Sequence, residues 1–147
     1  MRGTSWGVAT APPTTDPPKK DTAHATASVG SVTSDEGHIW FYKDVSQASV
    51  QELVQALHKA AIERRVLAAK HGLPAPLPIH LHIHSYGGEV YAGFAATDAI
   101  LRCPVPVHTH IEGGAASAAT LFSIAGAHRT IGANSSILKP AFSAVSA

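Results

Sequence analysis

The segment from Ile79 to His84 restricts the possible folds of this 147-residue chain more than any other feature. Its residues alternate strictly between an aliphatic side chain and histidine. Because side chains in a strand point alternately to opposite faces, this pattern predicts a strand with one apolar face. A second alternating run, Val107 to Ile111, predicts another strand of the same kind.

Three segments carry helical signals. The first begins near Val50, after the capping-box pattern Ser49–Glu52, and is stopped by Gly72 and the prolines that follow. An apolar stripe at helical spacing runs along it: Val50, Leu53, Val54, Leu57 and Ala61. Val90–Leu101 predicts a second helix, and a third runs from about Ser117 to Ala125.

Short strands complete the pattern. Residues 38–42 are rich in strand formers, and residues 129–131 and 136–138 predict two further strands. Strands and helices therefore alternate along the chain. This order predicts an α/β fold with a parallel sheet and right-handed β-α-β crossovers.

The first 37 residues differ in composition from the rest. They are rich in Thr, Ala, Ser, Gly and Pro and have no periodic apolar face. Such a segment buries too little apolar surface to offset its ordering entropy, so residues 1–37 are predicted to be a disordered, low-complexity segment before a domain at 38–147. A transit peptide is the alternative, and the four acidic residues of the segment count against it.

Composition excludes several classes of protein. The net charge is +1 and charged residues make up 14%, which argues against nucleic-acid binding. The only cysteine, Cys103, permits neither an intrachain disulfide nor a CxxC zinc site. Neither a secretory signal nor a membrane span is recognisable, so we expect a cytoplasmic protein without membrane contact.

Two junctions between a strand and a helix carry a glycine pair, Gly87-Gly88 and Gly113-Gly114, which we interpret as turns. Ligands of α/β folds bind at the carboxyl ends of strands, and glycine lets backbone N–H groups approach them closely. Such a pair of junctions could hold an oxyanion, with Ser117 as a nucleophile. A serine at the start of a helix is also a common N-cap, and this alternative stays open.

Three motifs in order resemble the proteolytic subunit of the Clp protease, especially its short phage-type variants. Residues 83–90 (Ile-His-Ser-Tyr-Gly-Gly-Glu-Val) are similar to the family's Ile-Asn-Ser-Pro-Gly-Gly-x-Val. Residues 92–100 resemble the helix that follows it. Residues 113–119 (Gly-Gly-Ala-Ala-Ser-Ala-Ala) resemble the nucleophile motif Gly-x-Ala-Ala-Ser-x-Gly/Ala, and Ala-Gly-Ala at 125–127 follows at the family's distance.

The resemblance implies a site residue by residue. Ser117 matches the nucleophile, and the N–H groups of Gly88 and Ala118 match the oxyanion hole. Aligning Asn134–Leu138 with the family's Asn-Ser-x-x-x-Ile-His-Gln puts Pro140 where the general-base histidine belongs. The family's aspartate has no counterpart, so the ClpP/crotonase-like domain is expected to be incomplete at its C-terminus. His84 and His110 are the candidates to replace the base.

The implied function is that of a serine-type endopeptidase of the ATP-dependent Clp system. Such an enzyme cleaves unfolded polypeptides through an acyl-enzyme, inside a homo-oligomeric ring fed by a Clp-type ATPase chaperone. The chain itself would need no cofactor. Without a matching base it is expected to be nearly inactive. Because the family's ring-to-ring contact lies in the C-terminal part that this sequence lacks, it is also expected to form no stable double ring. The alternatives are a non-catalytic or fragmentary family member and a crotonase-type acyl-CoA enzyme.

Histidines line one face of each alternating strand: His80, His82 and His84 on the first, and His108 and His110 on its neighbour. Imidazoles at this spacing can ligate a metal ion. Polar or half-buried positions of a sheet explain them equally, and we expect no metal site.

Overall fold

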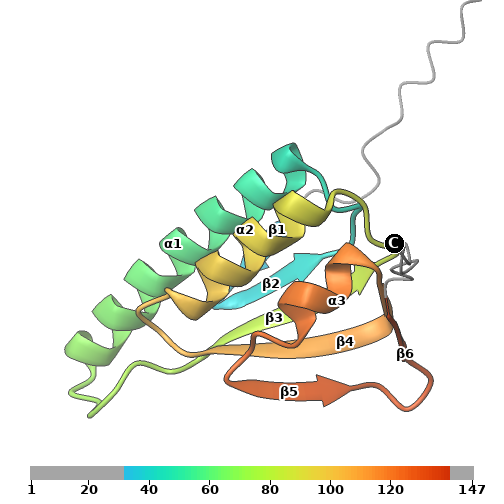
Figure 1. Ribbon diagram of the computed structural model, residues 1–147. Helices are drawn as coiled ribbons and strands as arrows, with labels where there is room; N and C mark the ends of the chain where they lie inside the picture. Colours follow the sequence, from blue (N-terminus) through green and yellow to red (C-terminus); the bar gives the residue numbers. More distant parts are fainter. Residues whose placement is uncertain (1–31, 140–147) are drawn as a thin grey trace, which may run out of the picture.

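The alternating segments form the centre of a six-stranded sheet in the computed structural model, which describes residues 32–139 (Figure 1). The strands are β1 (Thr33–Asp35), β2 (His38–Phe41), β3 (Ile79–Ser85), β4 (Val107–Ala116), β5 (His128–Ile131) and β6 (Ser136–Leu138). The helices are α1 (Gln47–Lys70), α2 (Val90–Leu101) and α3 (Ala118–Ser123).

The predicted α/β fold with a parallel sheet is confirmed. Strands β2, β3, β4 and β5 are neighbours in this order and run parallel, whereas β1 pairs antiparallel with β2. Strand β6 pairs parallel with the last part of β4, beyond the part that pairs with β5. The carboxyl ends of β3, β4 and β6 therefore lie at one edge of the sheet.

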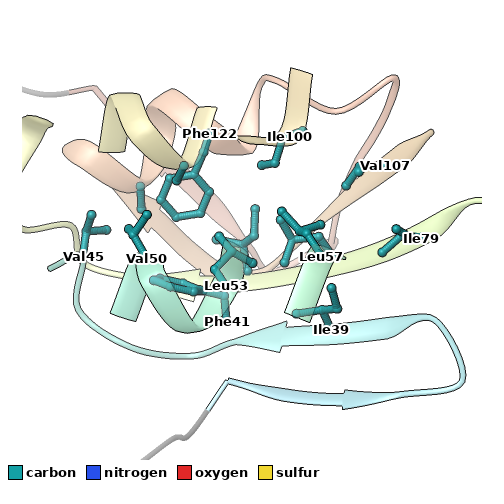
Figure 2. Packing of buried hydrophobic residues seen from close by; sticks show 14 of the residues in the cluster. Ile39, Phe41, Val45, Val50, Leu53, Leu57, Ile79, Ile100, Val107 and Phe122 are labelled. Atoms are coloured by element: carbon teal, nitrogen blue, oxygen red, sulfur yellow. The ribbon is translucent and has the colours of Figure 1, made fainter. Parts of the chain in front are cut away.

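One face of the sheet is covered by helices and holds the core. The aliphatic residues Ile79, Leu81 and Ile83 of β3 are fully buried, as predicted from the alternation. Leu53 and Leu57 of α1 belong to the same core and lie among its apolar side chains in Figure 2. The rings of Phe41 and Phe122 meet edge to face with centroids 5.3 Å apart, which ties α3 to β2. Each such buried side chain contributes about 1.5–3 kcal/mol through the hydrophobic effect.

Helix α1 begins earlier than predicted. Its N-cap is Ser46, and the capping box joins Ser46 and Ser49 rather than Ser49 and Glu52. Ser46 Oγ accepts from the Ser49 N–H, while the Ser46 N–H donates to Ser49 Oγ. The Glu52 carboxylate is bound instead by Lys43 Nζ at 2.8 Å. A serine pair with this spacing satisfies the same orphan N–H groups as the expected Ser/Glu pair.

The second predicted glycine turn is wrong. Gly113 and Gly114 lie inside β4, which continues to Ala116 because β6 pairs with Gly114–Ala116. Helix α3 is correspondingly shorter than predicted, at Ala118–Ser123.

The predicted boundary at residue 37 is also wrong for the described part of that segment. Thr33–Asp35 forms β1, which is stabilised by its antiparallel pairing with β2. Residues 1–31 of the predicted disordered segment lie outside the described residues. Within residues 32–139, no helix is long and apolar enough to span a lipid bilayer.

Candidate active site

Ser117 lies at the junction of β4 and α3 in an unusual backbone conformation. Its φ is 50° and its ψ is −123°, a combination that L-residues rarely adopt. Its N–H donates to the carbonyl oxygen of Leu138 at 3.0 Å, which fixes the strained residue against β6. Ser117 makes no side-chain cap hydrogen bond, so the N-cap interpretation does not account for it. Backbone strain of this kind costs on the order of 1–3 kcal/mol and is concentrated at functional sites.

The loop after β3 packs directly against this junction. A Cβ atom on Gly87 would lie 2.7 Å from Ser117 Cβ and 3.2 Å from the Ala118 nitrogen. Gly87 also has a φ of +101°, which favours glycine. Only glycine therefore lets this loop come so close to Ser117.

The segment before α1 holds the same loop in place. The Val45 N–H donates to the Gly87 carbonyl and the Glu89 N–H donates to the Val45 carbonyl, both at 2.8 Å. Between these bonds Gly88 forms an isolated parallel bridge with Val45. The sequence analysis missed Val45, because a backbone contact carries no signature in the side chain.

Two backbone N–H groups at this junction have no hydrogen-bond acceptor among the described residues. Among the hydrogen bonds within residues 32–139, neither the Gly88 N–H nor the Ala118 N–H has a protein acceptor. They belong to the two segments that Gly87 brings together. An arrangement of two free N–H groups beside a serine can stabilise an oxyanion that develops on a bound carbonyl group.

Strand β6 ends beside Ser117. The Leu138 carbonyl accepts from the Ser117 N–H and, at 3.1 Å, from Thr120 Oγ1. Lys139 is exposed, and Pro140 lies outside the described residues.

The two histidines considered as substitute bases have different surroundings. His110 uses both ring nitrogens, with His80 Nδ1 at 2.9 Å from its Nε2 and Thr130 Oγ1 at 2.6 Å from its Nδ1. His84 accepts the Gly114 N–H at 3.1 Å through Nδ1. It also lines a cavity of about 210 Å³ together with Ala116, the residue before Ser117.

The sheet face opposite the helices carries most of the histidines. We call it the histidine face and define it by residues of β2 to β5 and their ends: His38, Trp40, Tyr42, His80, His82, His84, His108, His110, Glu112, His128 and Thr130. Stacked rings run across it, including His38 on His80 with centroids 4.8 Å apart and Trp40 on His82 at 5.2 Å. The sequence analysis found the histidines of β3 and β4 but not these partners, because strand register decides which residues meet.

Burial and close contacts between neighbouring side chains determine the charges of this face. Burial, followed by the neighbouring imidazoles, lowers the pKa of His80 to about 4. Burial also lowers the pKa of His110. Burial alone would raise the pKa of Glu112, but hydrogen bonds from Tyr42 and His82 lower it overall. The pKa of Tyr42 is raised to about 12 by burial and by this carboxylate. At neutral pH the face therefore holds uncharged His80 and an ionised Glu112.

Comparison with known proteins gives one family and one fold. The family model for the Clp protease matches residues 22–141. ClpP1 from Listeria monocytogenes is 22% identical with a TM-score of 0.61, over 77% of this chain and 62% of that chain. A point mutant of the same protein gives 21% and 0.60, over 71% and 56%. The ClpP protease catalytic domain from Plasmodium falciparum gives 20% and 0.57, over 68% and 52%.

These structures share the fold at an identity too low to transfer a site. The chain spans only about half to three fifths of their length. No curated protein matches the sequence.

Proposed function

Since this chain belongs to the Clp protease family, we propose that it carries the serine-peptidase site of that family, with Ser117 as the nucleophile. The observation that carries the proposal is the contact of the Gly87-Gly88 loop with Ser117 and Ala118. This contact brings a strained serine and two free N–H groups to one place. The motifs at residues 83–90 and 113–119 meet here, although more than 20 residues separate them along the chain.

The proposed reaction is acyl transfer from a peptide bond. Ser117 Oγ attacks the carbonyl carbon, and the N–H groups of Gly88 and Ala118 bind the oxygen as it becomes negative. The proton of the serine hydroxyl is transferred to the leaving amine, and an acyl-enzyme forms, which water then hydrolyses. Each donor of an oxyanion hole contributes on the order of 10²–10³ in rate.

This site has no titratable residue at the position that the motif alignment gives for the general base. A serine hydroxyl is a poor nucleophile until a base within about 3 Å takes its proton. The motif alignment places Pro140 at the position of that base, and proline has no titratable atom. We therefore expect very slow hydrolysis by this chain.

The same observation favours a second candidate, a non-catalytic member of the family. In that case Ser117 and the two donors remain from an active ancestor and do not turn over substrate. The crotonase-type alternative has no specific observation in its favour. Unfolded polypeptides as substrates, a Clp-type ATPase chaperone as partner and a homo-oligomeric ring are proposed here by family alone.

Restoring the base tests the proposal. In an unrelated serine protease, losing the base costs about 2 × 10⁶ in turnover and losing the orienting aspartate about 3 × 10⁴. Pro140→His without an aspartate should therefore raise the hydrolysis of a fluorogenic peptide by up to about 10²-fold. Adding Ser117→Ala to that variant should remove the gain.

Pro74→His is the matched control, because it adds the same side chain in the exposed loop before β3, at the other end of the sheet. No gain from Pro140→His, or an equal gain from Pro74→His, would contradict the proposed site. If, in addition, the unaltered chain and Ser117→Ala hydrolyse the peptide equally, the non-catalytic candidate is preferred.

A further inference from the structure

The histidine face contains a hydrogen-bonded chain of side chains that the proposed peptidase site does not use. His82 Nδ1 lies 2.6 Å from Glu112 Oε1, and the other oxygen of Glu112 accepts from the Tyr42 hydroxyl. His82 Nε2 lies 3.0 Å from His38 Nδ1. These hydrogen bonds thus join both ends of β2, the middle of β3 and the middle of β4.

The hydrogen bonds of Glu112 decide where the protons of these side chains lie, because one of its oxygens accepts from the Tyr42 hydroxyl and the other lies 2.6 Å from His82 Nδ1. A carboxylate accepts, so His82 Nδ1 carries the proton and donates it to Glu112. His82 Nε2 is then bare, and its lone pair points at His38 Nδ1. A histidine whose second nitrogen is held by a carboxylate in this way is the usual arrangement of a metal ligand, because the carboxylate fixes the ring and makes it more basic.

A second pair of imidazoles lies beside the first. His80 Nδ1 and His110 Nε2 are 2.9 Å apart, and Thr130 Oγ1 holds the other nitrogen of His110. All four histidines are half-buried, so solvent reaches them from the open side of the sheet.

We propose that the histidine face binds a divalent transition-metal ion, Cu²⁺, Ni²⁺ or Zn²⁺, with His38 Nδ1 and His82 Nε2 as its primary ligands. Two nitrogens that bind one ion at 2.0–2.1 Å are themselves about 2.9–3.4 Å apart, and this pair already has that spacing. Imidazole is a ligand that these ions share. On binding, the ion displaces the hydrogen bond between the two rings and lies beside the line that joins the two nitrogens, while the proton of His38 moves from its Nδ1 to its Nε2.

The site is a paired one. Within residues 32–139, no three histidine, cysteine or acidic side chains form a metal-binding group, so the proposed site has two protein ligands. This proposal departs from the sequence-based expectation of no metal. That expectation weighed the spacing along single strands, whereas the pairs form across strands.

Copper titration of the complete chain tests the site. With one equivalent of Cu²⁺, electron paramagnetic resonance should show splitting from imidazole nitrogens. The double variant His38→Gln/His82→Gln should lose at least tenfold in affinity. Glu112→Gln keeps both ligands but removes the orienting charge, and should lose about 10–100-fold.

The matched control is His58→Gln/His71→Gln, which removes two exposed histidines of α1 and its C-cap. It should bind Cu²⁺ like the unaltered chain. Unchanged affinity in His38→Gln/His82→Gln, or a larger loss in the α1 variant, would overturn the proposal.

A measurement on the unaltered chain avoids any dependence on the folding of variants. Paramagnetic Cu²⁺ should broaden the amide signals of residues 38–42 and 80–84 in a ¹H–¹⁵N spectrum first. Broadening centred on His24 or on residues 58–71 would refute the assigned site.

Discussion

One methyl group added at Gly88 should push the glycine loop of the candidate active site away from Val45, which holds it in place. A Cβ atom there would lie 2.1 Å from the Val45 carbonyl oxygen and 3.0 Å from the Val45 carbonyl carbon. Both contacts are with backbone, so no side chain can rotate away. The φ of Gly88 is +147°, which adds strain for any L-residue. In Gly88→Ala the loop must therefore move away from Val45.

The cost follows from the bonds that this movement breaks. Two hydrogen bonds join Val45 to the loop, one to Gly87 and one to Glu89. Each contributes about 0.5–1.5 kcal/mol, and the strained φ costs on the order of 1–3 kcal/mol. Together these give about 2–6 kcal/mol, against a total stability of about 5–15 kcal/mol for a typical domain. For a chain of this size, the lower bound corresponds to a fall in Tm of roughly 6 °C.

Thermal unfolding followed by circular dichroism measures this cost, with Gly72→Ala as the control. Gly72 also has a positive φ, +62°, but a Cβ atom there meets no atom within 4 Å. That variant should lose only about 1–2 kcal/mol for its left-handed backbone. If Gly88→Ala unfolds at the same temperature as Gly72→Ala or above it, the two hydrogen bonds of Val45 do not hold the loop in place.

Two further substitutions test the core and the histidine face. Thr109 is fully buried and donates to the Ser123 carbonyl at 2.7 Å, so Thr109→Val should leave that oxygen unpaired and lower the free energy of unfolding by about 1–3 kcal/mol in urea titrations. A smaller effect than that of the exposed Thr33→Val would contradict this reading. The pKa of His80 is about 4 in the folded chain against 6.5 for the free side chain, so the unfolded chain binds more protons between these values. Stability should therefore fall as pH falls from 6.5 to 4, and His80→Gln should reduce that fall. An identical pH dependence in both proteins would show that His80 does not cause it.

Local patterns determined much of the fold. Strict alternation placed Ile79, Leu81 and Ile83 on one face, and this face is the one that the helices bury. The helix Val90–Leu101 lies where its sequence predicted it. The motif around Ser117 and the Gly87-Gly88 pair also indicated residues of the candidate active site. These features are readable because periodicity, caps and glycine positions act over a few residues.

The tertiary structure decided what depends on distant partners. Gly113 and Gly114 look like a turn, but β6 pairs with this stretch and extends β4 through it. Val45 holds the glycine loop through backbone atoms alone. The meeting of His82 with His38 and Glu112 follows from strand register, which no single strand contains. The residues around each position set its local conformational preference, whereas the packing of the whole sheet determines which strand residues make contact.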